Sequence, residues 1–194
     1  MSGGLPALTN RIHELLTRSG TVTVAIDGPC GAGKSTMGET LRSAFSVQGC
    51  NLFHMDDFFL WPFQRTAFRL GQPGGNVDRE RFLSEVLQPL KSGHAFVYQK
   101  YNCQSDELLP MSIKPRRIAV IEGVYSLHPE LRQYYDLKVF LDIDGKMQIE
   151  RLKNRSAPDQ YRRFITEWIP LEESYFNALN IREAADMILR SEEL

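Results

Sequence analysis

The clearest chemical signal in this sequence is an eight-residue stretch from Gly28 to Ser35. It reads GPCGAGKS and fits the pattern G-x-x-x-x-G-K-[ST]. Its glycines allow the backbone to curl so that N–H groups converge on phosphate oxygens. Lys34 would reach the β- and γ-phosphates of a nucleotide, and the Ser35 hydroxyl would bind Mg²⁺. The motif therefore predicts a nucleotide-binding loop made of Gly28, Gly31, Ala32, Gly33, Lys34, Ser35 and Thr36.

Two adjacent carboxylates, Asp56 and Asp57, stand in the apolar stretch FHMDDFF. Such surroundings penalise an unpaired ionised group by several kcal/mol. One interpretation is a strand end with a capping Asp, and the other is a catalytic base beside a substrate. In an extended strand neighbouring side chains point to opposite sides, so only one of the two is expected to face the phosphates.

Strands and helices alternate around these residues. The loop lies between an apolar, β-branched run and a segment of helical character that ends at Gly49. We expect further strands over 51–55, 116–123, 135–144 and 185–190 and helices over 7–20, 78–90 and 144–155, with Asp78 as an N-cap. This order predicts an α/β fold of the P-loop NTPase or kinase type. We expect a parallel sheet of about five strands with helices on both faces, in a single domain over residues 1–194.

Composition narrows the class of partner. A net charge of −1 and a pI near 6.4 argue against nucleic acid and favour a small molecule. Three cysteines without metal-ligand spacing indicate a reduced compartment, and no apolar run approaches the roughly 20 residues of a membrane span. We expect a cytoplasmic protein, and a homo-oligomer is left open.

Two other classes of nucleotide-binding protein lack their motifs here. The sequence has no N-K-x-D segment for guanine recognition and no LSGGQ-like signature. A small-molecule kinase remains, in which Asp56 could accept the proton of an acceptor hydroxyl. The irregular stretch from Trp61 to Gly75 is expected to overhang the site.

Five motifs, GPCGAGKST, HMDDFF, NVDRERF, YQKYN and VIEGVYSL, resemble those of the uridine kinase family in order and approximate spacing. This family includes phosphoribulokinase-like and pantothenate kinase-like relatives, and the resemblance runs from about Val22 to Arg155. It implies ATP and Mg²⁺ as cofactors and the 5′-hydroxyl of uridine or cytidine as the acceptor. It also implies that Asp56 is the catalytic base and that Asp57 fills the variable next position.

The resemblance further suggests roles near the acceptor. Glu122 resembles an acidic residue near Mg²⁺ or the acceptor, although a solvent-facing strand end is the alternative. Asp78 resembles a residue that contacts ribose hydroxyls. Tyr101 resembles a pocket tyrosine, but Asn102 replaces the usual Asp that follows it. The substrate side is assigned to Asp57, Phe59, Asp78 and Tyr101, where Phe59 is either an aromatic ring that stacks on a base or an ordinary core residue.

Arg151 and Arg155 are four residues apart and share a helix face. They resemble lid arginines that neutralise charge on the transferred group, and Pro158 would provide a hinge in a small lid over about 151–165. Arg162 and Arg163 are either additional lid residues or a solvated basic face. Two alternatives stay open for the whole chain. One is a kinase for another small alcohol, such as pantothenate, a sugar or a sugar phosphate, and the other is a nucleotide-dependent binding module without phosphoryl transfer.

Overall fold

The computed structural model describes residues 4–103 and 105–193. Its centre is a five-stranded sheet in the order β2-β5-β1-β6-β7, and every neighbouring pair is parallel. The strands are β1 (Val22–Asp27), β2 (Cys50–His54), β5 (Ile118–Glu122), β6 (Leu137–Asp142) and β7 (Met187–Arg190). All five residues of β5 are buried, as expected for a strand covered on both faces.

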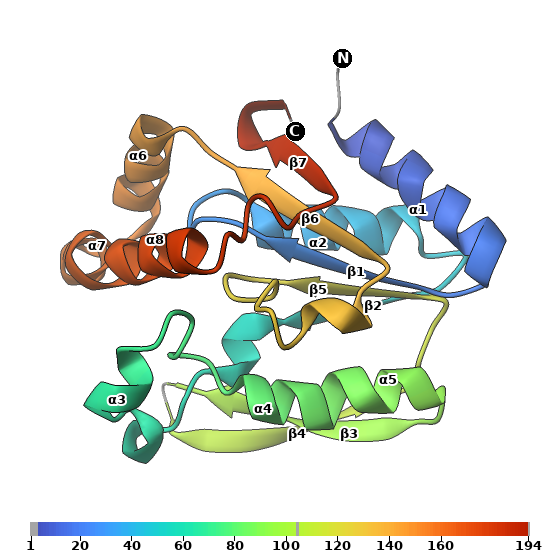
Figure 1. Ribbon diagram of the computed structural model, residues 1–194, viewed down its shortest axis with the longest axis horizontal. Coiled ribbons are helices and arrows are strands. Elements are labelled where there is room, and N and C mark those ends of the chain that lie inside the picture. Colours follow the sequence, from blue (N-terminus) through green and yellow to red (C-terminus); the bar gives the residue numbers. More distant parts are fainter. Residues whose placement is uncertain (1–3, 104, 194) are drawn as a thin grey trace.

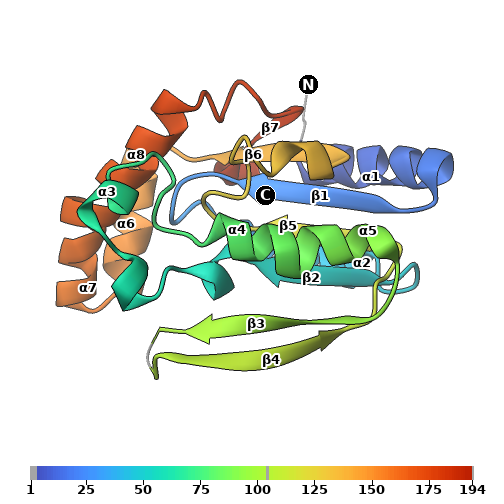
Figure 2. The ribbon, with the colours of Figure 1, turned by 60° about the horizontal axis from the view of Figure 1, so that its bottom comes forward.

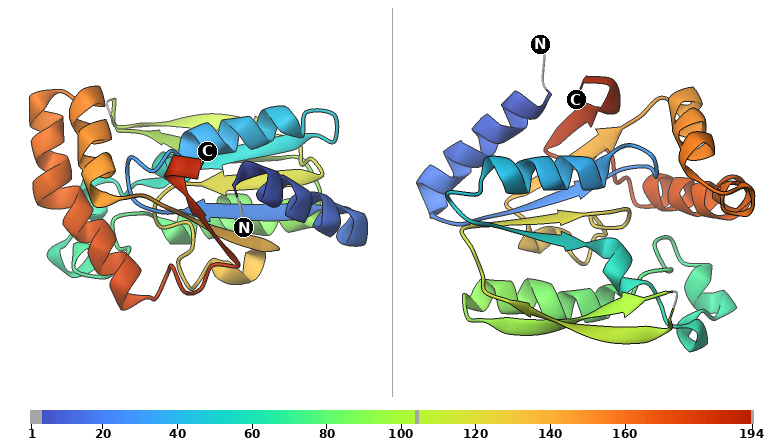
Figure 3. Two further views of the ribbon diagram at one scale, coloured as in Figure 1. Left: turned by 90° about the horizontal axis from the view of Figure 1, so that it is seen from above. Right: turned by 180° about the vertical axis from the view of Figure 1, so that it is seen from behind.

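One face of the sheet is covered by α1 (Leu5–Ser19) and α2 (Lys34–Ala44), which lie in front of it in the right panel of Figure 3. Leu8, Ile12 and Leu16 of α1 recur at helical spacing and join the core beneath. Helix α1 ends at Gly20, whose left-handed φ of 77° suits a glycine. The helices expected on both sides of the nucleotide loop are therefore present.

The other face is covered by a helical stretch made of α4 (Arg79–Phe82), the π-helical η3 (Leu83–Leu87) and α5 (Gln88–Ser92). Asp78 caps this stretch, because its side chain accepts a hydrogen bond from Arg81 N. Pro89 lacks a backbone N–H, so the regular ladder cannot continue through it, and the π-turn precedes it.

An antiparallel hairpin that the sequence reasoning did not anticipate packs below the β2 edge (Figure 2). It consists of β3 (Phe96–Asn102) and β4 (Glu107–Ile113), paired from Phe96↔Ile113 to Asn102↔Glu107. Pro110 in β4 removes a donor from the ladder, and β4 shows no clean alternation of buried and exposed residues. Because of these features, the sequence of β4 shows no recognisable strand pattern.

A helical arm follows β6. It contains α6 (Gly145–Arg155), α7 (Pro158–Arg163), the π-helical η5 (Phe164–Trp168) and α8 (Ile169–Ala178). The arm stands on the side toward which the strand arrowheads point, to the left in Figure 1. The expected lid region, about 151–165, covers the end of α6, all of α7 and the start of η5. Helix α6 was expected, whereas α7 and α8 were not.

Short elements complete the chain: η1 (Met55–Phe58), η2 (Pro62–Gln64), α3 (Ala67–Leu70), η4 (Arg132–Tyr134) and η6 (Ser191–Glu193). The stretch expected to be irregular, Trp61 to Gly75, thus contains η2 and α3. None of the helices within residues 4–103 and 105–193 has the length and apolar character needed to span a bilayer.

Candidate active site

The nucleotide loop joins β1 to α2 and depends on glycine geometry. Gly28, Gly31 and Gly33 have φ values of 144°, 83° and 95°. A Cβ added at Gly28 would lie 2.2 Å from the backbone oxygen of Leu141 in β6. Only glycine allows β1 to turn into the loop this close to a neighbouring strand. The loop and the first turn of an eleven-residue helix form a favourable arrangement for an anion.

Lys34 starts α2 and folds back over the loop. Its Nζ donates to the carbonyl oxygens of Gly28 at 2.8 Å and Pro29 at 2.9 Å, and the side chain is buried. The ammonium group therefore lies against the loop itself. Thr36 is exposed in the same first turn, and a cleft of about 610 Å³ runs from Ser35 and Thr36 along α2.

Glu122 links the loop to the sheet. The Ser35 hydroxyl lies 3.1 Å from each Glu122 carboxylate oxygen, and Glu122 is only 4% exposed. The alternative of a solvent-facing strand end does not fit this burial. On the other side, His54 Nδ1 lies 2.5 Å from Glu122 Oε1, and this hydrogen bond is the main reason that the pKa of His54 is raised. Sequence reasoning missed His54, which is the last residue of β2 and pairs in register with Glu122.

Asp56 and Asp57 lie in the 3-10 helix η1 and not at a strand end, which corrects the argument from strand alternation. Side chains still diverge, because successive residues of a 3-10 helix are about a third of a turn apart. Asp56 is exposed at its surface. Protein nevertheless crowds its carboxyl group, and desolvation followed by the negative charge of Glu122 raises its pKa.

Asp57 is buried against the hairpin. Lys100 Nζ lies 2.8 Å from one of its carboxylate oxygens, and the Tyr98 hydroxyl donates to the other at 3.1 Å. Both partners belong to β3. The carboxylate that was assigned to the substrate side is therefore engaged by the hairpin.

The remaining acceptor-side residues surround η1. Asp78 Oδ2 accepts from Gln64 at 3.0 Å, and the Asp78 backbone N–H donates to Phe58 O at 2.7 Å. Phe59 forms an isolated bridge with Val77. The structure thus brings Phe59 and Asp78 together beside the aspartate pair.

Tyr101 lies on β3, and its hydroxyl donates to Asp106 Oδ1 at 2.6 Å. This hydrogen bond is the main cause that raises the pKa of Tyr101. Its ring centroid is 5.1 Å from that of Trp61. Tyr101 is only 4% exposed, so its ring is buried against Trp61 and offers little surface to an acceptor.

The four arginines of the arm separate into two groups. Arg151 Nη1 donates to the Gly31 carbonyl at 3.2 Å and to Ser191 Oγ at 2.5 Å, so it reaches the nucleotide loop. The other three are exposed and contact their own arm: Arg155 lies over the Phe164 ring, Arg162 pairs with Asp159, and Arg163 pairs with Glu167. Pro158 begins α7, and two residues separate it from the end of α6 at Arg155.

Two buried carboxylates beside the loop were also missed. Asp27 ends β1 and accepts from the backbone N–H groups of Gly28 at 2.7 Å and Leu127 at 2.9 Å, while Tyr175 donates to it at 2.8 Å. Burial raises the pKa of Asp27 to about 6. An acidic residue at the end of an apolar strand directly before the loop is a signal that could have indicated it.

Glu172 of α8 is the second buried carboxylate, and it accepts from Cys30 N at 2.8 Å. Burial raises the pKa of Glu172. Burial, followed by the charge of Glu172, also raises the pKa of the Cys30 thiol to about 12. From the sequence alone, the neighbouring helix N-terminus would be expected to lower that thiol pKa, and desolvation outweighs it. No local pattern in the sequence points to Glu172.

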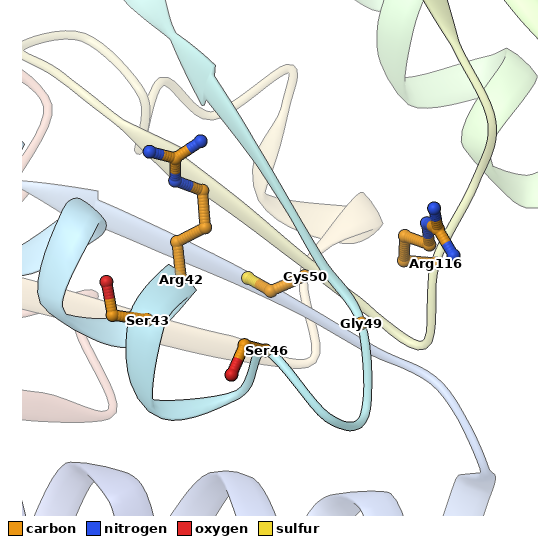
Figure 4. Close-up of a pocket in the computed structure, with 6 residues that line it drawn as sticks. All are labelled: Arg42, Ser43, Ser46, Gly49, Cys50 and Arg116. Atoms are coloured by element: carbon orange, nitrogen blue, oxygen red, sulfur yellow. The ribbon is translucent and has the colours of Figure 1, made fainter.

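A separate cleft of about 420 Å³ lies at the amino-terminal end of β2 (Figure 4). It is lined by Arg42, Ser43, Ser46, Gly49, Cys50 and Arg116. Ligands of parallel α/β sheets bind outside the carboxyl ends of the strands, where the loop, Glu122 and Asp56 meet. The Arg42 guanidinium is moreover paired with Glu39 at 2.6 Å. This cleft is not part of the candidate active site.

Comparisons with known proteins agree with this geometry. A model of the phosphoribulokinase / uridine kinase family matches residues 77–162. The chain is 23% identical over 149 residues to a uridine kinase of Clostridium perfringens (strain SM101 / Type A). This alignment covers 73% of this chain and 71% of that protein.

Two solved structures share the fold. A "possible uridine kinase" from Bacillus stearothermophilus aligns with a TM-score of 0.67 and 22% identity, over 94% of this chain and 99% of the other. The D-glycerate 3-kinase from Cryptococcus neoformans aligns with a TM-score of 0.66 and 14% identity, over 97% and 96% of the two chains.

The parallel sheet, the glycine loop, Glu122 at the end of β5 and Asp56 in the turn after β2 together are the features of a P-loop kinase. The chain resembles the phosphoribulokinase / uridine kinase family over residues 77–162, and the comparisons support an ATP-dependent small-molecule kinase. The family resemblance and the α/β kinase fold expected from the sequence are both confirmed.

Proposed function

We propose that this kinase uses Mg²⁺ and transfers the γ-phosphoryl group of ATP to the 5′-hydroxyl of uridine or cytidine. One arrangement carries the proposal. Asp56 is accessible in the turn after β2, and the same strand end is joined through His54 and Glu122 to Ser35 of the loop. A candidate base and a phosphate-binding loop thus share one edge of the sheet.

Asp56 has the properties of a general base for this reaction. In the transfer, the acceptor oxygen forms a bond to the γ-phosphorus, the bond from that phosphorus to the β-bridging oxygen breaks, and ADP leaves. The hydroxyl proton passes to the Asp56 carboxylate. Because desolvation and Glu122 raise the pKa of Asp56, this carboxylate holds the proton more readily than an ordinary aspartate does.

The residues at Ser35 fit a magnesium ion. The Ser35 hydroxyl and the Glu122 carboxylate offer oxygen ligands, and Mg²⁺ in kinases takes one or two protein oxygens together with water and phosphate oxygens. When bound, Mg²⁺ neutralises charge on the phosphates. Lys34 would add its positive charge after it leaves the carbonyls of Gly28 and Pro29.

The nucleoside acceptor is supported by the names of the relatives and by the wall of the site. The Clostridium perfringens relative is a uridine kinase. The half-buried ring of Trp61, packed on the buried Tyr101, offers an aromatic surface to a base, and Asp78 lies beside Phe59. Another small alcohol is the second candidate, since a D-glycerate 3-kinase shares the fold and Asn102 replaces the usual Asp.

An acceptor panel tests the proposal. ADP formation from ATP would be measured with uridine, cytidine, D-glycerate, pantothenate, a hexose and a sugar phosphate, with Lys34→Ala as the inactive control. We expect turnover with uridine and cytidine. Turnover with another alcohol alone would refute the nucleoside acceptor and leave the kinase intact. ATP consumption without any acceptor, or none with all of them, would favour the nucleotide-dependent binding module.

A further inference from the structure

Cys30, the third residue of the nucleotide loop, is held from both sides by the helical arm. Its backbone N–H donates to Glu172 Oε2 of α8 at 2.8 Å. Its carbonyl accepts from Gln148 Nε2 of α6 at 2.9 Å. Cys30, Gln148 and Glu172 are each less than a tenth exposed. Both polar groups of one buried peptide segment are therefore satisfied by side chains more than a hundred residues away.

The same support continues along the loop. The Gly31 carbonyl accepts from Arg151, and the Ala32 carbonyl accepts from Ser191 Oγ at 2.7 Å. Three successive carbonyls, those of residues 30 to 32, thus have side-chain donors. Gln148 and Leu152 also pack within 3.6 Å of the position where a Gly31 side chain would begin.

The loop's own residues provide only part of this support, because Lys34 donates to the carbonyls of Gly28 and Pro29 and not to those of residues 30–32. No strand or helix ladder includes residues 28–33, and three of the six are glycines, which lose the most conformational freedom when they are ordered. If only a fraction of the molecules hold the loop in its binding conformation, the apparent affinity for the ligand is reduced by that fraction. Contacts that hold Cys30 therefore act on nucleotide affinity.

Glu172 contributes through an acceptor oxygen and not through its charge. A negative charge beside a loop that binds phosphates repels them, and burial already disfavours the ionised form of Glu172. What the Cys30 N–H requires is an oxygen at hydrogen-bond distance. A glutamine can supply the same oxygen without the charge.

Helix α8 is fixed independently of Cys30. Tyr175, three residues after Glu172 and so on the same helix face, donates to the buried Asp27 at 2.8 Å. The Glu172 carboxylate is therefore presented from an anchored helix.

We propose that Glu172 and Gln148 are positioning residues that hold Cys30 and thereby preset the loop for the phosphates of the nucleotide. The inference rests on nucleotide binding at this loop and does not depend on which acceptor is used.

The test measures ADP affinity by titration calorimetry without any acceptor, so that an error in the acceptor cannot affect it. Glu172→Ala is expected to weaken ADP binding about tenfold, which corresponds to ~1.4 kcal/mol. Glu172→Gln is expected to stay within about twofold of the unmodified protein, because the acceptor oxygen is retained. Glu173→Gln is the matched control, since Glu173 is the next residue of α8 and is exposed.

Steady-state kinetics with the acceptor found by the panel provide a second measurement. The KM for ATP of Glu172→Ala should rise, and kcat at saturating ATP should stay within about twofold, because bound nucleotide orders the loop. A merely structural defect would lower the amount of active protein in the glutamine variant as well.

Two results would overturn the inference. One is a folded Glu172→Ala protein that binds ADP as the unmodified protein does. The other is equal weakening in the alanine and glutamine variants, which would assign the effect to charge. If the alanine variant does not fold, Gln148→Met decides, since it keeps the side-chain size and loses the donor to Cys30 O. We expect this variant to bind ADP several-fold more weakly, and unchanged binding would refute the role.

Discussion

At the scale of single residues, Asp56 and Asp57 are adjacent in the chain and differ in almost every other respect. Asp56 is exposed, and its main neighbours are charged groups of the site. Asp57 is buried and bound by Lys100 and Tyr98 of the hairpin. Only the first is free to receive a proton, and the second joins the hairpin to the core.

Substitution of each aspartate should separate these roles. Asp56→Asn is expected to lower kcat by about 10²–10⁴ and to leave ATP affinity nearly intact, because the loop holds the phosphates. Asp57→Asn should cost much less in kcat but about 1–2 kcal/mol in the free energy of unfolding, because the partly exposed Lys100 loses its partner. Kinetics and urea unfolding of both variants provide the check. Equal losses of kcat in two folded proteins would mean that the base has been assigned to the wrong residue.

The residues predicted from the sequence are those that lie in short, local patterns. Lys34 and Ser35 belong to a contiguous motif, and Glu122 follows a recognisable apolar strand. His54 and Glu172 could not be predicted in this way, since each acquires its place through a partner distant in the chain. Pairings of this kind depend on register and helix docking, which local composition does not encode.

At the scale of elements, the strand-to-helix turn at the loop depends on different glycines for different reasons. Gly28 is limited by contact, since an added Cβ would lie 2.2 Å from the Leu141 backbone oxygen. At Gly33 only the backbone conformation disfavours a side chain, because φ is 95° and no atom lies within 4 Å of an added Cβ. Alanine at the two positions should therefore have distinct effects.

We expect Gly28→Ala to lower the free energy of unfolding by more than about 3 kcal/mol, since a strand backbone cannot give way. Gly33→Ala should cost about 1–2 kcal/mol of backbone strain and mainly weaken ADP binding. Urea unfolding and ADP titration of the two proteins distinguish these outcomes. Similar unfolding free energies would show that contact with β6 does not limit position 28.

The elements that could be predicted are those with a strong period or a clear cap. The five central strands and α6 have such signals, and Asp78 caps its helix as its place in NVDRERF, directly before Arg79, indicates. The hairpin strand β4 contains Pro110 and is mostly exposed, so its sequence resembles a loop. Helix α8 carries Pro170 in its first turn and follows a π-helical stretch. The π-helical stretch interrupts the regular spacing of apolar residues by which a helix is recognised in a sequence.

At the scale of the whole molecule, two buried titratable groups act on stability in opposite directions. The pKa of Asp27 is raised to about 6 by burial, so the folded protein keeps a proton that the unfolded chain releases near pH 4. This contribution to stability is lost as the pH rises from about 4 to 6. Burial lowers the pKa of His128 to about 4, so its contribution is present above about pH 6.5 and is lost as the pH falls toward 4.

Because these effects oppose each other, a single substitution should reveal one of them. The unfolding free energy of Asp27→Asn, relative to the unmodified protein, is expected to rise by about 2–3 kcal/mol between pH 4 and pH 7. Urea unfolding at several pH values measures it. Asp159→Asn, which changes an exposed carboxylate on α7, serves as the control. A difference that does not vary with pH would contradict the pKa assigned to Asp27.

The position of β1 in the sheet also bears on how the protein is made. The nucleotide loop is synthesised early, yet its strand pairs on one side with β5 and on the other with β6, which begin at Ile118 and Leu137. The side chains that hold the loop come later still, from Gln148 to Ser191. A growing chain on the ribosome therefore carries the nucleotide motif without the support that shapes it. Nucleotide in the cell would bind and stabilise finished molecules rather than nascent ones.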